Sequence, residues 1–186
     1  EIGCKYKVPI YVASSSKNAK GTYIKEQDEI MEEKVITGLS VSNNIIMITV
    51  NNILFKLNNI AEIFEKVAKE NINLDMISQT SPLNGRVNLS FTSSKEDLQL
   101  IKKVMNEVKS KDRELEVVIE ENISKISLVG IGMMNQSGVT GRVFRALADN
   151  EIEFRQITTS EISISYTLDA INREKAVNVL AREFNL

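Results

Sequence analysis

The residues best suited to bind a ligand form a glycine-containing loop at residues 130–138. A helix is predicted to begin directly after this loop, near Val139, with Ser137 as its N-cap residue. Because the first backbone N–H groups of a helix have no partner within it, this helix start favours a carboxylate or another anion. A polar strand end, residues 156–161, is predicted to face the loop. Together the two segments could hold an amino acid, with its carboxylate at the helix start and its amino group on carbonyl or carboxylate oxygens.

The loop also has a purely structural interpretation, in which its glycines only allow a tight backbone geometry. It does not match a nucleotide-binding fingerprint, because the dinucleotide pattern would need glycine at position 135, where this chain has Asn135. The Gly-Lys-Ser/Thr sequence of a P-loop is absent as well. The loop alone leaves the structural and the ligand-binding interpretations open.

Two polar residues in the first half of the chain are further candidates for ligand binding. Asp75 is a charged residue within an otherwise apolar predicted strand, and Gln79 follows that strand. Asp75 could bind an ammonium group, or it could face solvent on an edge strand, and Gln79 has the same ambiguity. No spacing of carboxylates in the chain suggests a metal site.

The composition excludes several classes of function. The 186 residues are 42% hydrophobic and 26% charged, and the net charge of −2 argues against nucleic-acid binding. No apolar run approaches the length of a membrane span. Cys4 is the only cysteine, which excludes an internal disulfide and suits a cytoplasmic protein. The chain has no histidine, the commonest general base and metal ligand, so we predict binding rather than catalysis, with no catalytic residue and no metal.

Residues 43–122 show the element order βαββαβ, which predicts a ferredoxin-like module with two helices on one face of a four-stranded antiparallel sheet. The first helix is predicted to open at Asn58 or Asn59, with an apolar face at helical spacing. The full set of expected elements is a strand at 45–50, a helix to 71, a strand at 72–78, a turn at 81–85, a strand at 87–92, a helix at 95–109 and a strand at 115–120.

The same order restarts after residue 122, with a strand at 126–130, a helix at 139–150, strands at 152–158 and 162–167, and a helix at 172–183. An offset of 80 pairs Phe64 with Phe144 and Ala68 with Ala148, and it also pairs Ile72 with Ile152 and Ile77 with Ile157. The strand at 87–92 matches the one at 162–167 at an offset of 75. Agreement in spacing and in element order predicts an internal repeat.

The second unit ends without a fourth strand, whereas a surplus strand at 35–42 precedes the first unit and is separated from it by a turn at Asn43-Asn44. We therefore predict an α+β chain with two ferredoxin-like modules, the first (43–122) inserted within the second (35–42 plus 123–186). Residues 1–24 contain strands at 8–13 and 22–24 and are interpreted as the tail of another domain. The charged segment 25–34 is interpreted as a linker.

Several segments resemble a known family. The second ACT module of aspartate kinases is closely similar to Val129-Gly130-Ile131-Gly132-Met133, Gly138-Val139, Phe144-Arg145-Ala146-Leu147 and the run 157–165. The C-terminal residues 176–186 look like the end of that family, and 8–24 resembles the last strands of the amino-acid kinase catalytic domain. The resemblance covers essentially the whole chain and is looser in the first module.

The resemblance implies the regulatory region of an enzyme that phosphorylates L-aspartate with ATP, the first step toward lysine, threonine and methionine. The family's catalytic motifs are not in this chain, so the chain alone should be inactive and need no cofactor, while ATP and magnesium are implied for the full enzyme. Feedback inhibition by lysine, with threonine as a second effector, is implied, as are a homodimer through the ACT modules and contact with the chain's own kinase domain. The alternative is a dimerisation scaffold that binds no effector.

The resemblance also assigns effector-binding residues, namely Met133, Gln136, Gly138, Val139, Thr140 and Phe154 in the second module and Asn58, Asn59, Leu74, Asp75 and Gln79 in the first. Arg155 stands where some lysine-binding relatives have aspartate. The first-module loop 55–58 departs from the usual Asp-x-Pro-Gly. The implied mechanism is an effector that bridges modules, with Asp75 binding its α-ammonium group and the helix start near Asn58 and Asn59 binding its carboxylate.

Overall fold

The computed structural model describes residues 2–16, 20–24, 34–134 and 136–186. The predicted linker 25–34 lies outside this description except for Lys34. The N-terminal part contains the short helix α1 (Ile2–Lys5) and an antiparallel hairpin of β1 (Ile10–Val12) with β2 (Thr22–Ile24). Within the described ranges, every helix is too short or too polar to span a lipid bilayer.

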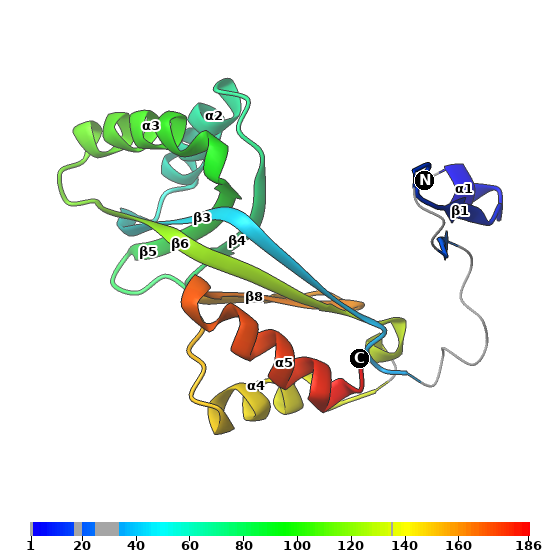
Figure 1. Cartoon of the computed structure of the whole chain (residues 1–186). Helices are drawn as coiled ribbons and strands as arrows, with labels where there is room; N and C mark the ends of the chain where they lie inside the picture. The colour runs from blue at the N-terminus through cyan, green and yellow to red at the C-terminus, as the bar shows by residue number, and fades with distance from the viewer. Residues whose placement is uncertain (1, 17–19, 25–33, 135) are drawn as a thin grey trace.

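The main body is built on a six-stranded antiparallel sheet in the order β4-β5-β3-β6-β8-β7. Its two central strands, β3 and β6, are long and run through both halves of the body (Figure 1). The strands are β3 (Gly38–Leu54), β4 (Leu74–Gln79), β5 (Arg86–Ser94), β6 (Glu116–Val129), β7 (Gln156–Thr159) and β8 (Ser163–Asp169).

The continuity of these two strands corrects the sequence prediction. Separate strands were expected at 35–42 and 45–50, and again at 115–120 and 126–130, with a turn at Asn43-Asn44. Instead, both asparagines lie within β3, where the register against β6 shifts on either side of Ile45. Such bulges bend a strand without ending it. The turn propensity of asparagine is overridden here because β6 pairs with β3 on both sides of the irregularity.

The two ends of β3 have different neighbours. Its first part pairs with Lys125 through Val129 of β6, and that part of β6 pairs with β8 on its other side. From Ile45 onward, β3 lies between β5 and the first part of β6. We retain the division into 43–122 and 35–42 plus 123–186 as our interpretation of this pairing, and we call these parts the first and second modules.

Each module has two helices on one face of its half of the sheet. The first has α2 (Leu57–Lys69) and α3 (Leu98–Lys111), and the second has α4 (Val139–Asp149) and α5 (Arg173–Phe184). Strand alternation explains the burial: Val87, Leu89 and Phe91 of β5 join the core beneath α2 and α3, whereas Ser90 and Thr92 point to the opposite face. A separate core lies beneath α4 and α5.

The two halves of the sheet face each other, with the helix pairs on the two outer sides (Figure 1). The edge strands β4 and β7 therefore come into contact, and Gln156 Nε2 donates to Ser78 Oγ at 2.8 Å. Ion pairs from Asp75 to Lys125 and from Arg155 to Glu120 also connect the modules. A small apolar cluster of Ile45, Met47 and Ile123 adds to this layer.

Candidate functional site

A cavity of about 390 Å³ lies at the start of α4. Five residues assigned to the effector site line it: Met133, Gln136, Gly138, Val139 and Thr140. It is also lined by Met134, Ser137, Thr159, Ser160, Glu161 and Ile164. The loop and the polar strand end that the sequence pointed to thus form one concave site. Of this second group, Thr159, Ser160 and Glu161 belong to the polar run 156–161, and Met134 and Ser137 belong to the loop, but none had been assigned as an effector contact.

Helix α4 begins without a capping side chain among the described residues. Gly138 is its N-cap, with a φ of +87°, and it is not Ser137 as the sequence predicted. Glycine takes this position because the left-handed backbone conformation strains residues that carry a Cβ atom. The first intrahelical bond runs from Arg142 N to Gly138 O at 3.0 Å. The backbone N–H groups before Arg142 therefore remain donors for an anion in the cavity.

The earlier glycines of the loop have a different, structural role. A Cβ atom on Gly130 would lie 2.0 Å from the carbonyl oxygen of Val35, and one on Gly132 would lie 2.8 Å from Val35 Cα. Both glycines are needed because the backbone entering β3 passes directly against them. The structural and the ligand-binding interpretations of the loop thus apply to different residues: Gly130 and Gly132 allow packing, and Gly138 faces the cavity.

The opposite wall of the cavity is polar and held in place by the turn between β7 and β8. Ser160 N donates to Ser163 O at 2.8 Å, and the hydroxyl groups of the two serines lie 2.8 Å apart. Glu161, at the tip of this turn, places an exposed carboxylate across from the positive end of the α4 dipole. A zwitterion could therefore place its carboxylate at the helix and its ammonium group at Glu161.

Three residues that precede the cavity wall lie away from it. Phe154 packs edge to face against Phe144, with ring centroids 5.2 Å apart, and contacts the second core. Arg155 Nε lies 3.4 Å from Glu120 Oε1. Gln156 is buried between the modules. Among the second-module residues that the resemblance assigned, only Phe154 is outside the cavity lining.

The structure separates the first-module candidates into two groups. Asn59 lies in the first turn of α2 and donates through Nδ2 to Leu54 O at 3.0 Å, while Asn58 beside it is exposed. Gln79 is exposed at the end of β4. At the other end of β4, Leu74 packs against the first core and the Asp75 carboxylate is paired with Lys125.

Asp75 is too far from the α2 start to share one small ligand with it inside a single chain. Leu74 lies opposite Ser93 of β5, whereas Leu54, just before α2, lies opposite Arg86. Seven residues of strand separate these positions, which corresponds to about 23 Å at roughly 3.3 Å per residue. An effector that contacts both groups would have to lie between two copies of the chain.

No group of three or more Asp, Glu, Cys or His residues suited to a metal ion occurs in the described parts of the chain. The second-module cavity has instead the donors, the acceptors and the volume for a small organic zwitterion, because pockets for small molecules combine apolar walls with a few placed polar groups.

Comparisons with known proteins agree with this fold. The ACT domain family matches residues 126–184. A curated aspartokinase from Geobacillus stearothermophilus is 33% identical over all 186 residues, which cover 45% of that relative. The solved structure of aspartokinase alpha and beta subunits is 32% identical with a TM-score of 0.75, over 81% of this chain and 99% of that one. The chain spans about half the length of the curated relatives it matches.

Two further solved structures are similar. The ligand-free regulatory subunit of aspartate kinase from Thermus thermophilus is 27% identical with a TM-score of 0.76, over 81% of this chain and 99% of that one. The E. coli aspartokinase III complex with lysine and aspartate is 22% identical with a TM-score of 0.76, over 98% of this chain and 40% of that one, a likeness of fold. The fold and these similarities place the chain in the class of regulatory proteins built from ACT modules. The chain belongs to the aspartokinase family, as its regulatory region.

Proposed function

We propose that this chain senses an end-product amino acid and thereby inhibits an aspartate kinase of which it is a part. In this proposal the full enzyme phosphorylates L-aspartate with ATP and magnesium in the cytoplasm, and residues 1–24 are the end of its catalytic domain. The observation that carries the proposal is the second-module cavity, where the uncapped start of α4 faces Glu161. A coupling of about 1–3 kcal/mol between effector and active site would change the activity several-fold or more.

Lysine is the effector that we propose first, because the similar E. coli aspartokinase III has been solved with lysine bound. Its α-carboxylate would accept hydrogen bonds from the first turn of α4, near Val139 and Thr140, and an ammonium group would bind Glu161. Threonine is the second candidate. Its smaller side chain would leave more of the cavity of about 390 Å³ unfilled.

The first module would complete its own site only in a homodimer. Because Asp75 and the start of α2 lie at opposite ends of β5, the proposed effector contacts of Asn58 and Asn59 and those of Asp75 would come from two chains. Asp75 is already paired with Lys125, so an effector ammonium group would have to displace that side chain. We therefore expect the second-module cavity to bind more tightly.

The test is the melting temperature of the 186-residue chain with lysine, threonine or methionine, since a ligand that binds only the folded state raises it. Glu161→Gln should weaken the effect of lysine by about tenfold, as expected when one charge-assisted contact is lost. Glu174→Gln is the matched control, because it removes an exposed carboxylate that lies on α5 and not in the cavity. Equal lysine responses in the two variants would contradict the proposed site.

A dimerisation scaffold is the second candidate function. It is favoured by two features of the first module: the loop before α2 lacks glycine, and Asp75 has an ion-pair partner within the chain. In that case none of the three amino acids would shift the melting temperature at millimolar concentration, and the chain would still be a dimer by sedimentation.

A further inference from the structure

A second cavity, of about 270 Å³, lies in the first module between α2, α3 and the end of β3. Its floor consists of the apolar side chains of Ile53, Ile63, Val108 and Leu115, all of them buried core residues. It lies on the helix-covered face of the sheet, not on the layer between the modules. Asn59, which the resemblance assigned to the first-module effector site, lies at its edge, but the rest of the groove is not used by the proposed effector function.

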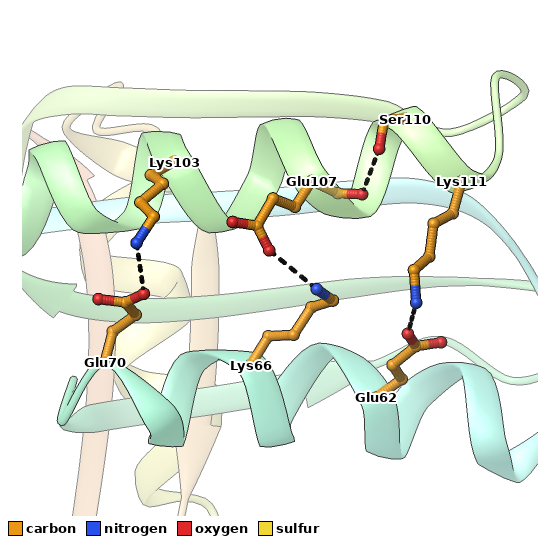
Figure 2. Close-up of polar contacts among 7 residues, drawn as sticks. All are labelled: Glu62, Lys66, Glu70, Lys103, Glu107, Ser110 and Lys111. Atoms are coloured by element: carbon orange, nitrogen blue, oxygen red, sulfur yellow. Dashed lines mark hydrogen bonds and ion pairs between the residues drawn. The ribbon is translucent and has the colours of Figure 1, made fainter.

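The rim of this groove carries both signs of charge. Lys66 and Lys111 contribute cations, and Glu62 and Asp112 contribute carboxylates. Figure 2 shows how ion pairs from α2 to α3 cross the groove: Glu62 pairs with Lys111, and Lys66 Nζ lies 2.9 Å from Glu107 Oε2. These pairs are partly exposed, so they contribute little stability and can exchange partners with a charged ligand.

The second module fills the equivalent end of its own groove with side chains, although a cavity of about 310 Å³ remains between α4 and α5. At the repeat offsets, Arg142 stands where Glu62 stands in the first module, and Phe184 stands where Lys109 does. The Phe184 ring is buried, and Arg142 lies over it with its guanidinium carbon 4.7 Å from the ring centroid. Arg142 also donates to the side chain and the carbonyl oxygen of Glu183. The first module has neither side chain: the position of Phe184 is taken by the exposed Lys109, and that of Arg142 by Glu62, which pairs with Lys111 across the groove.

We propose that the α2–α3 groove of the first module binds an α-amino acid with an aliphatic side chain, such as leucine. The side chain occupies the apolar floor of Ile53, Ile63, Val108 and Leu115. The carboxylate binds Lys66 and Lys111, and the ammonium group binds Glu62 and Asp112. A cavity of about 270 Å³ is slightly below the range of about 300–1,000 Å³ for drug-sized ligands, which suits a molecule as small as one amino acid.

The chemistry of the groove selects against other small ligands. The cationic side chain of lysine would place a charge on an apolar floor, which is unfavourable without a partner. A simple anion such as phosphate would leave that floor uncovered. Aliphatic amino acids satisfy both parts of the groove, because burial of their side chain removes apolar surface from water while the zwitterionic group remains at the charged rim.

The test is a titration of the methyl-labelled 186-residue chain with L-leucine, followed by NMR. The methyl groups of Ile53, Ile63, Val108 and Leu115 should shift saturably, while those of Val139 and Ile164 at the second-module cavity should not. Val108→Phe should abolish the shifts by filling the floor. Lys109→Phe places a phenylalanine at the exposed position that corresponds to Phe184 in the second module. It should weaken leucine binding by about tenfold or more, and it serves as the test if Val108→Phe fails to fold.

A second pair of variants tests whether the charged rim of the groove contributes to leucine binding. Lys111→Gln keeps the length of the side chain but removes the cation, so leucine should bind several-fold more weakly. Lys102→Gln removes a cation from α3 that pairs with Glu121 and lies outside the groove, and it should leave binding unchanged. Floor methyl groups that do not shift at millimolar leucine, or shifts that persist in Lys109→Phe, would overturn the proposal. Binding of lysine at the second-module cavity is independent of either outcome.

Discussion

Tyr166 should destabilise the folded chain through its hydroxyl group, and Tyr166→Phe should therefore increase stability. The side chain is 0% exposed in the second core, and its hydroxyl group has no hydrogen-bond partner among the described residues. The first module has Phe91 at the equivalent position of the repeat, in a similarly buried place. A phenylalanine is thus compatible with this position in the same fold.

The expected gain follows from the desolvation of the hydroxyl group. A buried polar group without a partner costs about 1–3 kcal/mol, and removing it without creating a cavity recovers part of that free energy. We expect Tyr166→Phe to raise the free energy of unfolding by about 1 kcal/mol. For a chain of this length that corresponds to roughly 2–4 °C in melting temperature. The reciprocal change, Phe91→Tyr, should lower stability by a similar amount.

The pH dependence provides a second, independent measurement. Burial raises the pKa of Tyr166 far above its usual value because the charged phenolate is poorly solvated in the core. An unfolded tyrosine ionises near about pH 10. Above that pH the unfolded chain loses this proton while the folded chain keeps it, so the stability of the wild type falls as the pH rises, and below that pH it does not change through this group. The advantage of Tyr166→Phe should grow between about pH 10 and pH 11.

Urea unfolding of wild type and variant at pH 7 and at about pH 11 measures both effects. The other three tyrosines, Tyr6, Tyr11 and Tyr23, are exposed in the N-terminal part and are the same in both proteins. Their titration therefore cancels in the comparison. A variant that is less stable than wild type at pH 7, or a stability difference that does not grow in alkali, would refute the reasoning.

Two further predictions concern packing at the loop and between the modules. Gly130→Ala should destabilise by about 3 kcal/mol or more, because the new Cβ atom would overlap the carbonyl oxygen of Val35; Gly141→Ala, in open space within α4, should instead stabilise by about 1 kcal/mol. Thermal unfolding of the two variants would show opposite shifts, and shifts of the same sign would contradict this account. Ser78→Ala should cost about 1 kcal/mol, because the buried Gln156 amide loses its acceptor at 2.8 Å and keeps only the Ser90 carbonyl oxygen at 3.5 Å. In a double-mutant cycle with Gln156→Leu the two changes should be far from additive, and additivity would show that the bond does not couple the modules.

Several features of the fold could be predicted from local patterns. The apolar faces of α2 and α4 repeat every three or four residues, and their buried residues, Ile63 and Val67 in one and Val143 and Leu147 in the other, lie at the repeat offset of 80. Such periodicity depends only on neighbours along the chain. The loop at 130–138 and the polar run at 156–161 were recognisable for the same reason, and the cavity between them follows from the order of the elements.

Other features of the fold and the site depend on which strands pair with each other, and strand pairing cannot be read from a local sequence pattern. Asn43 and Asn44 have the composition of a turn, yet they lie inside β3 because β6 continues beside them. Ser137 has the residue type of an N-cap, yet the chain path places Gly138 there. The pairing of Asp75 with Lys125 joins residues fifty positions apart, and it depends on the contact between the two halves of the sheet.

The sequence by itself thus determined the element types, the internal repeat, the family and the absence of histidine chemistry, since each of these depends on residue type and spacing. The tertiary structure decided which glycines of the loop support packing and which one faces the ligand cavity, because that difference is set by the backbone of Val35, about a hundred residues away. It also decided where the cavities between paired helices lie and what lines them, since a groove is a property of two helices packed together.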